Sequence, residues 1–292
     1  MSSTNNIIST IDQKTSLSDQ ITQYVLSNKP KLFILTPCYG GMCHLNYVCS
    51  LIKTIDIFKT YHFPVQIEFC RNDSLVSRAR NNLIAKAMLD PEMTHILFID
   101  SDITWDTMDI FKLILANKPL IGGVYPLKHY FWDKIIPSTT SENNTLDKLL
   151  EKRSQNSILN RLYSEENFIK QNLLKYNVNY IHSNLSIDSN IAEVKHIATG
   201  FMMIQRNTLE TMMYHYSDTK YTDDVSFLSE NENQFAYALF DCRVEDNHYL
   251  SEDWLFCNRW ANIGGKIYID VSIDLTHTGQ EDYKGSYLST IL

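Results

Sequence analysis

The first half of the chain alternates between two spacings of apolar residues. Compact or alternating apolar runs predict buried strands at 31–36, 65–69, 95–99 and 120–125. We expect the first of these strands to end at Pro37. Apolar residues three and four apart predict intervening helices at 44–60, 77–89 and 107–116. In the first helix, the apolar positions are Leu45, Val48, Leu51, Ile52 and Ile55.

This order of strands and helices predicts an α/β fold, with a mostly parallel sheet covered by helices on both faces. Such a sheet binds ligands beyond the carboxyl ends of its strands. Three polar segments follow predicted strands, and we expect them at that edge: 36–41, 73–81 and 100–102.

The remaining segments differ in character. Residues 1–30 form a polar N-terminal segment with one short predicted helix at 16–27, and 31–292 form a single predicted domain. Residues 134–190 are rich in Ser, Asn, Lys and Glu, with helical spacing at 146–176, which predicts a helical insertion or lid. The sheet pattern returns at 194–205 and 266–273.

Composition narrows the function classes. The 292 residues are 44% hydrophobic, which excludes disorder throughout, and the formal net charge of −8 disfavours a nucleic-acid partner. No apolar run reaches the roughly 18 residues of a transmembrane helix, and no signal segment is visible, so we expect a soluble, cytoplasmic protein. The six cysteines form no C-x-x-C pair, which favours buried free thiols over a zinc site.

Asp100-Ser101-Asp102 directly follows the predicted strand at 95–99. Residues two apart on an extended chain point the same way, so two carboxylates would converge beyond the strand. Like charges repel there unless a cation lies between them, and a hard ion such as Mn²⁺ or Mg²⁺ would also bind a diphosphate. The alternative is that Asp102 belongs to the cap of the next helix.

Six segments, in order, resemble motifs of GT-A fold glycosyltransferases of the family-2-like, DxD-containing type, which use nucleotide-diphosphate sugars. They are Thr36–Tyr39, Asn72–Asn82, Phe98–Asp102, Ala198–Met203, Ser251–Trp260 and Leu275–Gly279. The resemblance covers residues 31–285 except the insertion. Phe256 stands where many relatives have Gln in the E-D … R-W segment, so the resemblance does not imply synthesis of a processive polymer.

The resemblance implies a GT-A sheet, a nucleotide and donor-sugar site, and a metal site. Asp100, Asp102 and His277 would be the metal ligands. The residues expected to bind the nucleotide sugar are Thr36, Pro37, Tyr39, Asp73, Arg78, Arg80, Asn81, Ser101 and Gly123.

Local chemistry offers alternatives for several of these residues. Arg78 and Arg80 begin a predicted helix, where both side chains and backbone favour anions, but they can equally form salt bridges. Asp73 can bind a base or ribose, or cap that helix. Gly123 would let a strand pass close to the donor sugar. His277 is either a metal ligand or a packed histidine.

Glu252 and Asp253 begin another predicted helix. Asp253, or else Glu252, would act as the general base on an acceptor hydroxyl, whereas the alternative is that Ser251 caps the helix and both acids complement its dipole. Aromatic residues close in sequence to Gly123 would line an acceptor site, or else belong to the core: Tyr125, Tyr130, Phe131 and Trp132.

The sequence thus predicts a metal-dependent glycosyltransferase that moves a sugar, most simply from a UDP-sugar, to a hydroxyl of a glycan, protein or other acceptor. Direct deprotonation of the acceptor by Asp253 implies inversion of the anomeric centre. The alternatives are an inactive sugar-nucleotide or glycan-binding protein and a metal-dependent nucleotidyltransferase. Self-association through the insertion is a further expectation.

Overall fold

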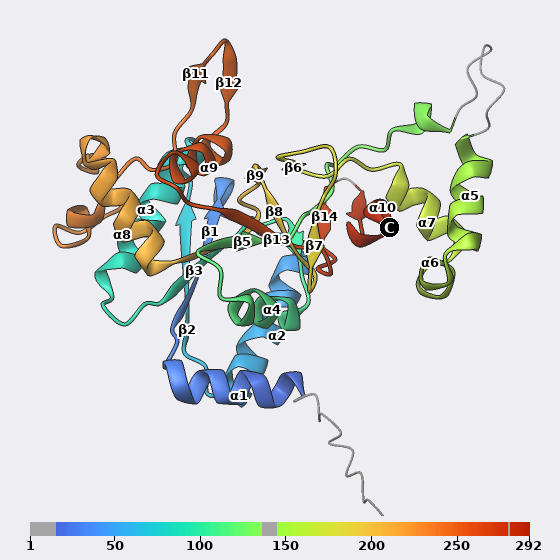
Figure 1. Ribbon diagram of the computed structural model, residues 1–292. Coiled ribbons are helices and arrows are strands. Elements are labelled where there is room, and N and C mark those ends of the chain that lie inside the picture. The colour runs from blue at the N-terminus through green and yellow to red at the C-terminus, as the bar shows by residue number, and fades with distance from the viewer. Residues whose placement is uncertain (1–15, 136–144, 280) are drawn as a thin grey trace, which may run out of the picture.

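The computed structural model describes residues 16–135, 145–279 and 281–292 (Figure 1). An eight-stranded sheet forms its centre. Its strands, in spatial order, are β2 (Val65–Arg71), β1 (Leu32–Cys38), β3 (His95–Ile99), β10 (Phe201–Gln205), β5 (Leu120–Gly122), β13 (Ile267–Asp270), β8 (Ile191–Val194) and β7 (Ile187–Asp188). Only β10 and β8 run against the others, so the predicted α/β fold with a mostly parallel sheet is confirmed.

Helices cover both faces of this sheet, because successive side chains of each strand point to opposite faces. Leu32 and Ile34 of β1 pack in the core with α1 (Leu17–Asn28), α2 (Leu45–Thr60) and α4 (Thr107–Ala116). Phe33 and Leu35 pack in the other core with α3 (Val76–Leu89), α8 (Arg206–His215) and α9 (Glu252–Asn262). Figure 1 shows these two groups of helices on opposite sides of the strands.

A small second sheet joins distant parts of the chain. Its strands are β15 (Asp282–Lys284), β14 (Thr276–Thr278) and β4 (Ile103–Thr104), which starts immediately after Asp102. His277 is opposite Ile103 in the antiparallel β14–β4 pair, and the amide of Thr278 donates to the Asp102 carbonyl at 2.8 Å. This pairing positions the end of the chain against the carboxyl end of β3.

The predicted insertion at 134–190 is helical between Thr145 and Asn172, whereas its last part, 173–190, contains the short strands β6 (Val178–Asn179) and β7 instead. Its helices are α5 (Thr145–Gln155), α6 (Ser157–Leu162) and α7 (Glu165–Asn172), and α7 contacts α10 (Leu288–Ile291). Figure 1 shows all four together, to one side of the sheet. Leu159, Phe168 and Leu173 are buried, so this group has apolar packing of its own. Residues 1–15 and 136–144, which belong to the predicted N-terminal segment and insertion, lie outside the described residues.

Short elements complete the fold. Two ribbons of paired strands are β6 (Val178–Asn179) with β9 (His196–Ile197), and β11 (Arg243–Glu245) with β12 (His248–Leu250). Single turns of 3₁₀ helix occur at η1 (Tyr39–Gly41), η2 (Trp132–Lys134), η3 (Ser217–Thr219) and η4 (Glu232–Phe235).

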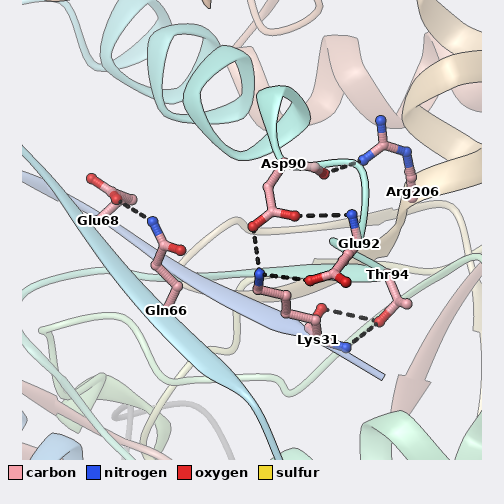
Figure 2. A network of polar contacts seen from close by, with 7 residues as sticks. All are labelled: Lys31, Gln66, Glu68, Asp90, Glu92, Thr94 and Arg206. Carbon is pink, nitrogen blue, oxygen red and sulfur yellow. Dashed lines mark hydrogen bonds and ion pairs between the residues drawn. The ribbon is translucent and has the colours of Figure 1, made fainter. Parts of the chain in front are cut away.

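A polar network ties four elements together where β1 and β3 begin (Figure 2). The ammonium of Lys31, just before β1, lies 2.6 Å from Asp90 and 3.4 Å from Glu92, which follow α3. The backbone of Lys31 also exchanges hydrogen bonds with the Thr94 hydroxyl, and Arg206 of α8 donates to the Asp90 carbonyl at 2.7 Å. These contacts fix the amino ends of the strands, at the edge away from the predicted site.

The structure corrects the predicted end of the first strand. β1 continues through Pro37 to Cys38, with Pro37 opposite Cys70 in β2. Proline has no N–H, but the pairing of β1 with β3 already ends at Leu35 and Phe98. Beyond Leu35, only β2 pairs with β1, so this position needs no second ladder hydrogen bond.

The predicted apolar stripe of α2 is also mostly wrong. Leu45 and Ile52 are 75% and 55% exposed, whereas Tyr47, Leu51 and Phe58 are buried against the sheet. The inward face also carries two buried hydroxyl residues that find hydrogen-bond partners in and around α4, namely Ser50 and Thr54. The face of α2 that packs against the sheet is therefore set by its large aromatic side chains and by hydroxyl groups that find hydrogen-bond partners.

Candidate active site at the carboxyl ends of β1 and β3

A pocket of about 260 Å³ lies at the carboxyl ends of β1 and β3, at the edge of the sheet where the sequence places ligands. Seven of the predicted site residues line it: Pro37, Tyr39, Asp73, Arg80, Asp100, Ser101 and Asp102. Ser74 and Val76 complete the lining. Segments from three separate predicted motifs thus meet in one pocket.

Asp100 and Asp102 enter this pocket by a different geometry from the one predicted. The chain does not stay extended after β3 but turns, and the amide of Ile103 donates to the Asp100 carbonyl at 3.0 Å. Both aspartates still line the pocket because the turn presents them together. Each carboxylate, however, has a different cationic partner, which balances the repulsion that the sequence led us to expect.

Asp100 pairs with Arg80, which is only 3% exposed. Arg80 donates from Nη2 to Asp100 at 3.0 Å and from Nε to Glu252 at 3.3 Å, and its guanidinium lies over the Phe98 ring. Burial disfavours the charged guanidinium, but the two carboxylates outweigh this effect and raise the pKa of Arg80. Nη1 is buried without a hydrogen-bond partner among the described residues. Arg80 therefore links β3 to the first turn of α9.

Asp102 lies between Lys128 and His277. The ammonium of Lys128 donates to Oδ2 of Asp102, and Nε2 of His277 lies 3.4 Å from the same oxygen. Burial would raise the pKa of this carboxyl, but the His277 and Lys128 contacts prevail and lower the pKa of Asp102 to about 2. Asp102 is thus ionised at neutral pH and faces two nitrogen atoms.

The protonation of His277 follows from its other contact. Nδ1 of His277 lies 2.8 Å from the carbonyl oxygen of Pro126, which can only accept a hydrogen bond, so Nδ1 carries the proton. Nε2 therefore donates to the Asp102 carboxylate when the ring is protonated, whereas in the neutral ring its lone pair is available to a metal ion beside that oxygen. A histidine that donates its second N–H to a backbone carbonyl has the arrangement typical of a metal ligand.

Only part of the predicted metal site fits an ion. Within the described part of the chain, no three His, Cys, Asp or Glu side chains are grouped so that they could hold one. The 3.4 Å between Asp102 and His277 suits neighbouring ligands of an octahedral ion, which are about 3 Å apart for bonds of about 2.1 Å. Because Mg²⁺-type sites take their other ligands from phosphates and water, this pair is sufficient on the protein side. Asp100 instead faces Arg80.

Arg78 and Asp73 form a bidentate ion pair at the rim of the pocket, with N–O distances of 2.8 and 2.9 Å. Asp73 also accepts from the amide of Leu75 at 2.9 Å, which orders the turn before α3, but Leu75 is the residue at the start of this helix and no side chain caps it. Burial opposes ionisation, but these donors lower the pKa of Asp73. Asp73 lines the pocket whereas Arg78 does not.

Three other predicted residues have structural contacts instead of pocket surface. Thr36 is buried, and its hydroxyl lies 2.6 Å from that of Tyr47. The Asn81 side chain exchanges hydrogen bonds of 2.7 and 2.9 Å with the backbone of Phe240. A Cβ on Gly123 would lie 2.8 Å from Ile273, so packing in the core requires glycine there.

Glu252 and Asp253 begin α9, and neither lines the pocket directly. Glu252 faces Arg80, whereas the buried Asp253 accepts from the Ser251 hydroxyl and from the amide of Trp254 at 2.8 Å. Ser251 does not cap the helix with its side chain. Burial raises the pKa of Asp253, although the hydrogen bond from Ser251 opposes this effect. The raised pKa makes the Asp253 carboxylate a stronger proton acceptor.

Sequence reasoning missed Lys128, and it misjudged Tyr125. Lys128 follows no motif, and only the fold brings it to Asp102. Tyr125 is buried beside His277, with ring centroids 5.1 Å apart, and its hydroxyl accepts from the amide of Gly200 at 3.3 Å. It therefore supports the site rather than lining an acceptor surface. Tyr130 packs on Trp132 and Tyr283.

No helix in the described ranges is long and apolar enough to cross a membrane. Comparison with known proteins identifies no family for this chain. No family model matches the chain, and no curated protein matches it.

Among solved structures, A197 from STIV is 13% identical, with a TM-score of 0.42, over 87% of this chain and 94% of that one. The 4-diphosphocytidyl-2C-methyl-D-erythritol synthase from Anaerococcus prevotii is 10% identical, with a TM-score of 0.31, over 70% and 82%. Scores this low say nothing about the chemistry of the pocket. The resemblance to GT-A glycosyltransferases therefore stays a prediction.

Proposed function

We propose that this protein is a metal-dependent glycosyltransferase that moves a sugar from a nucleotide-diphosphate donor, a UDP-sugar, to a hydroxyl acceptor. The observation that carries the proposal is the Asp102–His277 pair, held 3.4 Å apart beside a pocket at the carboxyl ends of the parallel strands. The donor set has one carboxylate oxygen and one imidazole nitrogen, which suits Mn²⁺ and Mg²⁺.

In this proposal, the pocket takes the nucleotide. Tyr39 and Pro37 provide an aromatic and an apolar surface for the base, and Asp73 accepts hydrogen bonds from ribose or base. The diphosphate lies toward Asp102, where the metal would offset the negative charge that develops on the leaving group. Lys128, which now contacts Asp102, is close enough to bind a phosphate oxygen by a small movement of its flexible side chain.

Asp253 serves as the general base. Its pKa is raised by burial, and it lies in the same turn of α9 as Glu252, which contacts Arg80 at the pocket. A base with a raised pKa takes the proton from an acceptor hydroxyl more readily than an ordinary carboxylate. Attack from the side of α9 would invert the anomeric centre. Glu252 and Arg80 position Asp100 and the start of α9 instead of reacting.

The test is incubation of the full chain with UDP-glucose, UDP-galactose, UDP-N-acetylglucosamine and GDP-mannose, each with Mn²⁺. Release of free nucleoside diphosphate from at least one donor is expected, and it should stop with EDTA and in Asp102→Asn. Lys118→Met, which changes a lysine over the distant Tyr268 ring, is the matched control. No nucleotide release from any donor, or release that persists in EDTA, would contradict the proposal. Release of pyrophosphate from CTP instead would favour a nucleotidyltransferase.

A further inference from the structure

A second cleft, of about 570 Å³, lies against another face of α9. Trp254 and Asn258 of α9 line it, one turn apart on the same face of the helix. Glu252, which faces Arg80, is two residues before Trp254 and hence about 200° away around the helix. The first turn of α9 therefore separates this cleft from the nucleotide pocket, with Asp253 between the two.

The floor of the cleft is a rigid aromatic pair. The rings of His196 and Trp254 stack with centroids 5.1 Å apart and an angle of 7°. Asn179 donates to Nδ1 of His196 at 3.1 Å, and Nε2 donates to Asn258 at 2.7 Å, so both ring nitrogens are satisfied in one neutral tautomer. Burial also lowers the pKa of His196, which keeps the ring uncharged near neutral pH. The aromatic surface is thus fixed before any ligand binds.

The walls of the cleft come from the two ribbons of paired strands. Tyr180 follows β6 on one side, and His248 and Tyr249 belong to β12 on the other. Tyr249 is 69% exposed, an unusual position for a large aromatic side chain. Figure 1 shows that the β11–β12 hairpin extends outward beyond α9, and residues of this hairpin line one side of the cleft.

The lining excludes two common classes of ligand. Lys195 is outnumbered by Glu245 and Asp246, so the charge does not favour a phosphate or a polyanion. Leu250 alone is aliphatic among the described lining residues, which argues against a lipid chain. What remains is aromatic faces beside amides and carboxylates. That combination suits a ring with apolar C–H faces and a rim of hydroxyl groups.

We propose that this cleft binds a neutral saccharide and that this saccharide is the acceptor, the second part resting on the proposed glycosyltransferase function. Trp254 supplies the stacking surface, and the backbone amide of Trp254 donates to Asp253 at 2.8 Å. Because Asp253 immediately precedes Trp254 in the first turn of α9, a sugar stacked on this ring would lie one residue along the helix from the residue assigned as the base. The two sites on either side of α9 hold donor and acceptor.

The test measures saccharide binding directly, without turnover. Methyl β-glucoside, methyl α-mannoside, lactose and chitobiose are added to the full chain, with and without UDP and Mn²⁺, and followed by saturation-transfer-difference NMR. At least one is expected to bind, and at least tenfold more weakly in Trp254→Ala and in Tyr249→Ala. Tyr214→Ala is the matched control, because Tyr214 is 80% exposed on α8, outside the cleft. Calorimetric UDP binding should be equal in all variants.

Tyr249→Ala decides the result if Trp254→Ala does not fold, because an exposed side chain contributes little to stability. The proposal is overturned if none of the four sugars binds, if binding does not change in Tyr249→Ala, or if a Ser/Thr-containing peptide binds there instead. Sugar binding in a protein that binds no UDP would leave the saccharide cleft intact and overturn the proposed donor chemistry. The two proposals can therefore fail separately.

Discussion

Nε2 of His277 lies 3.4 Å from Oδ2 of Asp102, although the two residues are 175 positions apart in the sequence. The antiparallel pair of β4 and β14 brings them together, and the hydrogen bond that Nδ1 of His277 donates to the Pro126 carbonyl fixes the orientation of the imidazole. The ammonium of Lys128 donates a hydrogen bond to the same carboxylate oxygen of Asp102. A protein cation therefore lies where the proposed metal ion would be bound.

This arrangement predicts competition between Lys128 and a metal ion for Asp102. Lys128→Met should bind Mn²⁺ at least about fivefold more tightly, because two positive charges about 4 Å apart repel by about 1 kcal/mol even in water. Asp102→Asn should abolish Mn²⁺ binding. Electron paramagnetic resonance of free Mn²⁺ measures both, with Lys118→Met as the control. An unchanged Mn²⁺ affinity in Lys128→Met would show that the ion does not bind at Asp102.

The acidic pair of α9 predicts a division of roles. Asp253→Asn should lower the rate of transfer by about 10²–10⁴-fold while UDP affinity and thermal stability stay near wild type, because the charge that accepts the proton is lost. Glu252→Gln should affect the rate less and stability more, because it weakens a pair with the buried Arg80. Steady-state kinetics and thermal denaturation separate the two effects. The reverse ranking would move the base to Glu252.

The helical insertion should be dispensable for donor binding. A deletion that tests this expectation must keep the last part of the insertion. The backbone of Lys175 and Asn177 is hydrogen-bonded to Leu127 and Tyr125 beside the site. Replacing 145–172 by a short Gly-Ser linker is expected to leave UDP affinity unchanged while lowering transfer or changing the oligomeric state. Calorimetry and light scattering measure these quantities. Lost UDP binding in a folded variant would make the insertion part of the donor site.

The buried His95 predicts a loss of stability in mild acid. Burial lowers its pKa to about 4, from about 6.5 in the unfolded chain, and its Nε2 has no hydrogen-bond partner among the described residues. The unfolded state therefore binds a proton first, and stability falls as the pH drops from about 6.5 to 4. This group accounts for about 2–3 kcal/mol between pH 7 and 4.5.

Urea unfolding at both pH values measures this effect. His95→Gln should lose less stability than wild type on acidification, whereas His182→Gln, which changes an exposed histidine, should behave as wild type. Equal pH dependence in His95→Gln and wild type would show that another group is responsible.

Much of the fold followed from local periodicity. The strand at His95–Ile99 and the helix at Thr107–Ala116 have the predicted bounds, because their apolar patterns are strong and their flanks are polar. The order of these elements also predicted the sheet and the edge at which the pocket lies. For α2 the same reasoning placed Leu51 correctly but failed for Leu45 and Ile52, which satisfy the helical period as well as the buried Tyr47 does. Only packing against the sheet selects one face.

The candidate site likewise has features that the sequence indicated and features that only the structure shows. The sequence by itself indicated Asp100 and Asp102, since two carboxylates directly after a buried strand are conspicuous without any knowledge of their neighbours. It could not show that Asp100 forms an ion pair with Arg80 and that Asp102 forms one with Lys128. Those contacts join side chains from distant segments, and no local spacing encodes them.

The sequence by itself thus indicated the strands and helices with strong apolar patterns in the first half of the chain, because each of these depends on neighbours within a few residues. The tertiary structure decided which charges meet, because the β4–β14 pair and the first turn of α9 are fixed only when the whole sheet has assembled. The aromatic cleft around Trp254 is also a feature that only the tertiary structure decides. Its rings come from β9, β12 and α9, and they form one surface only after these elements pack together.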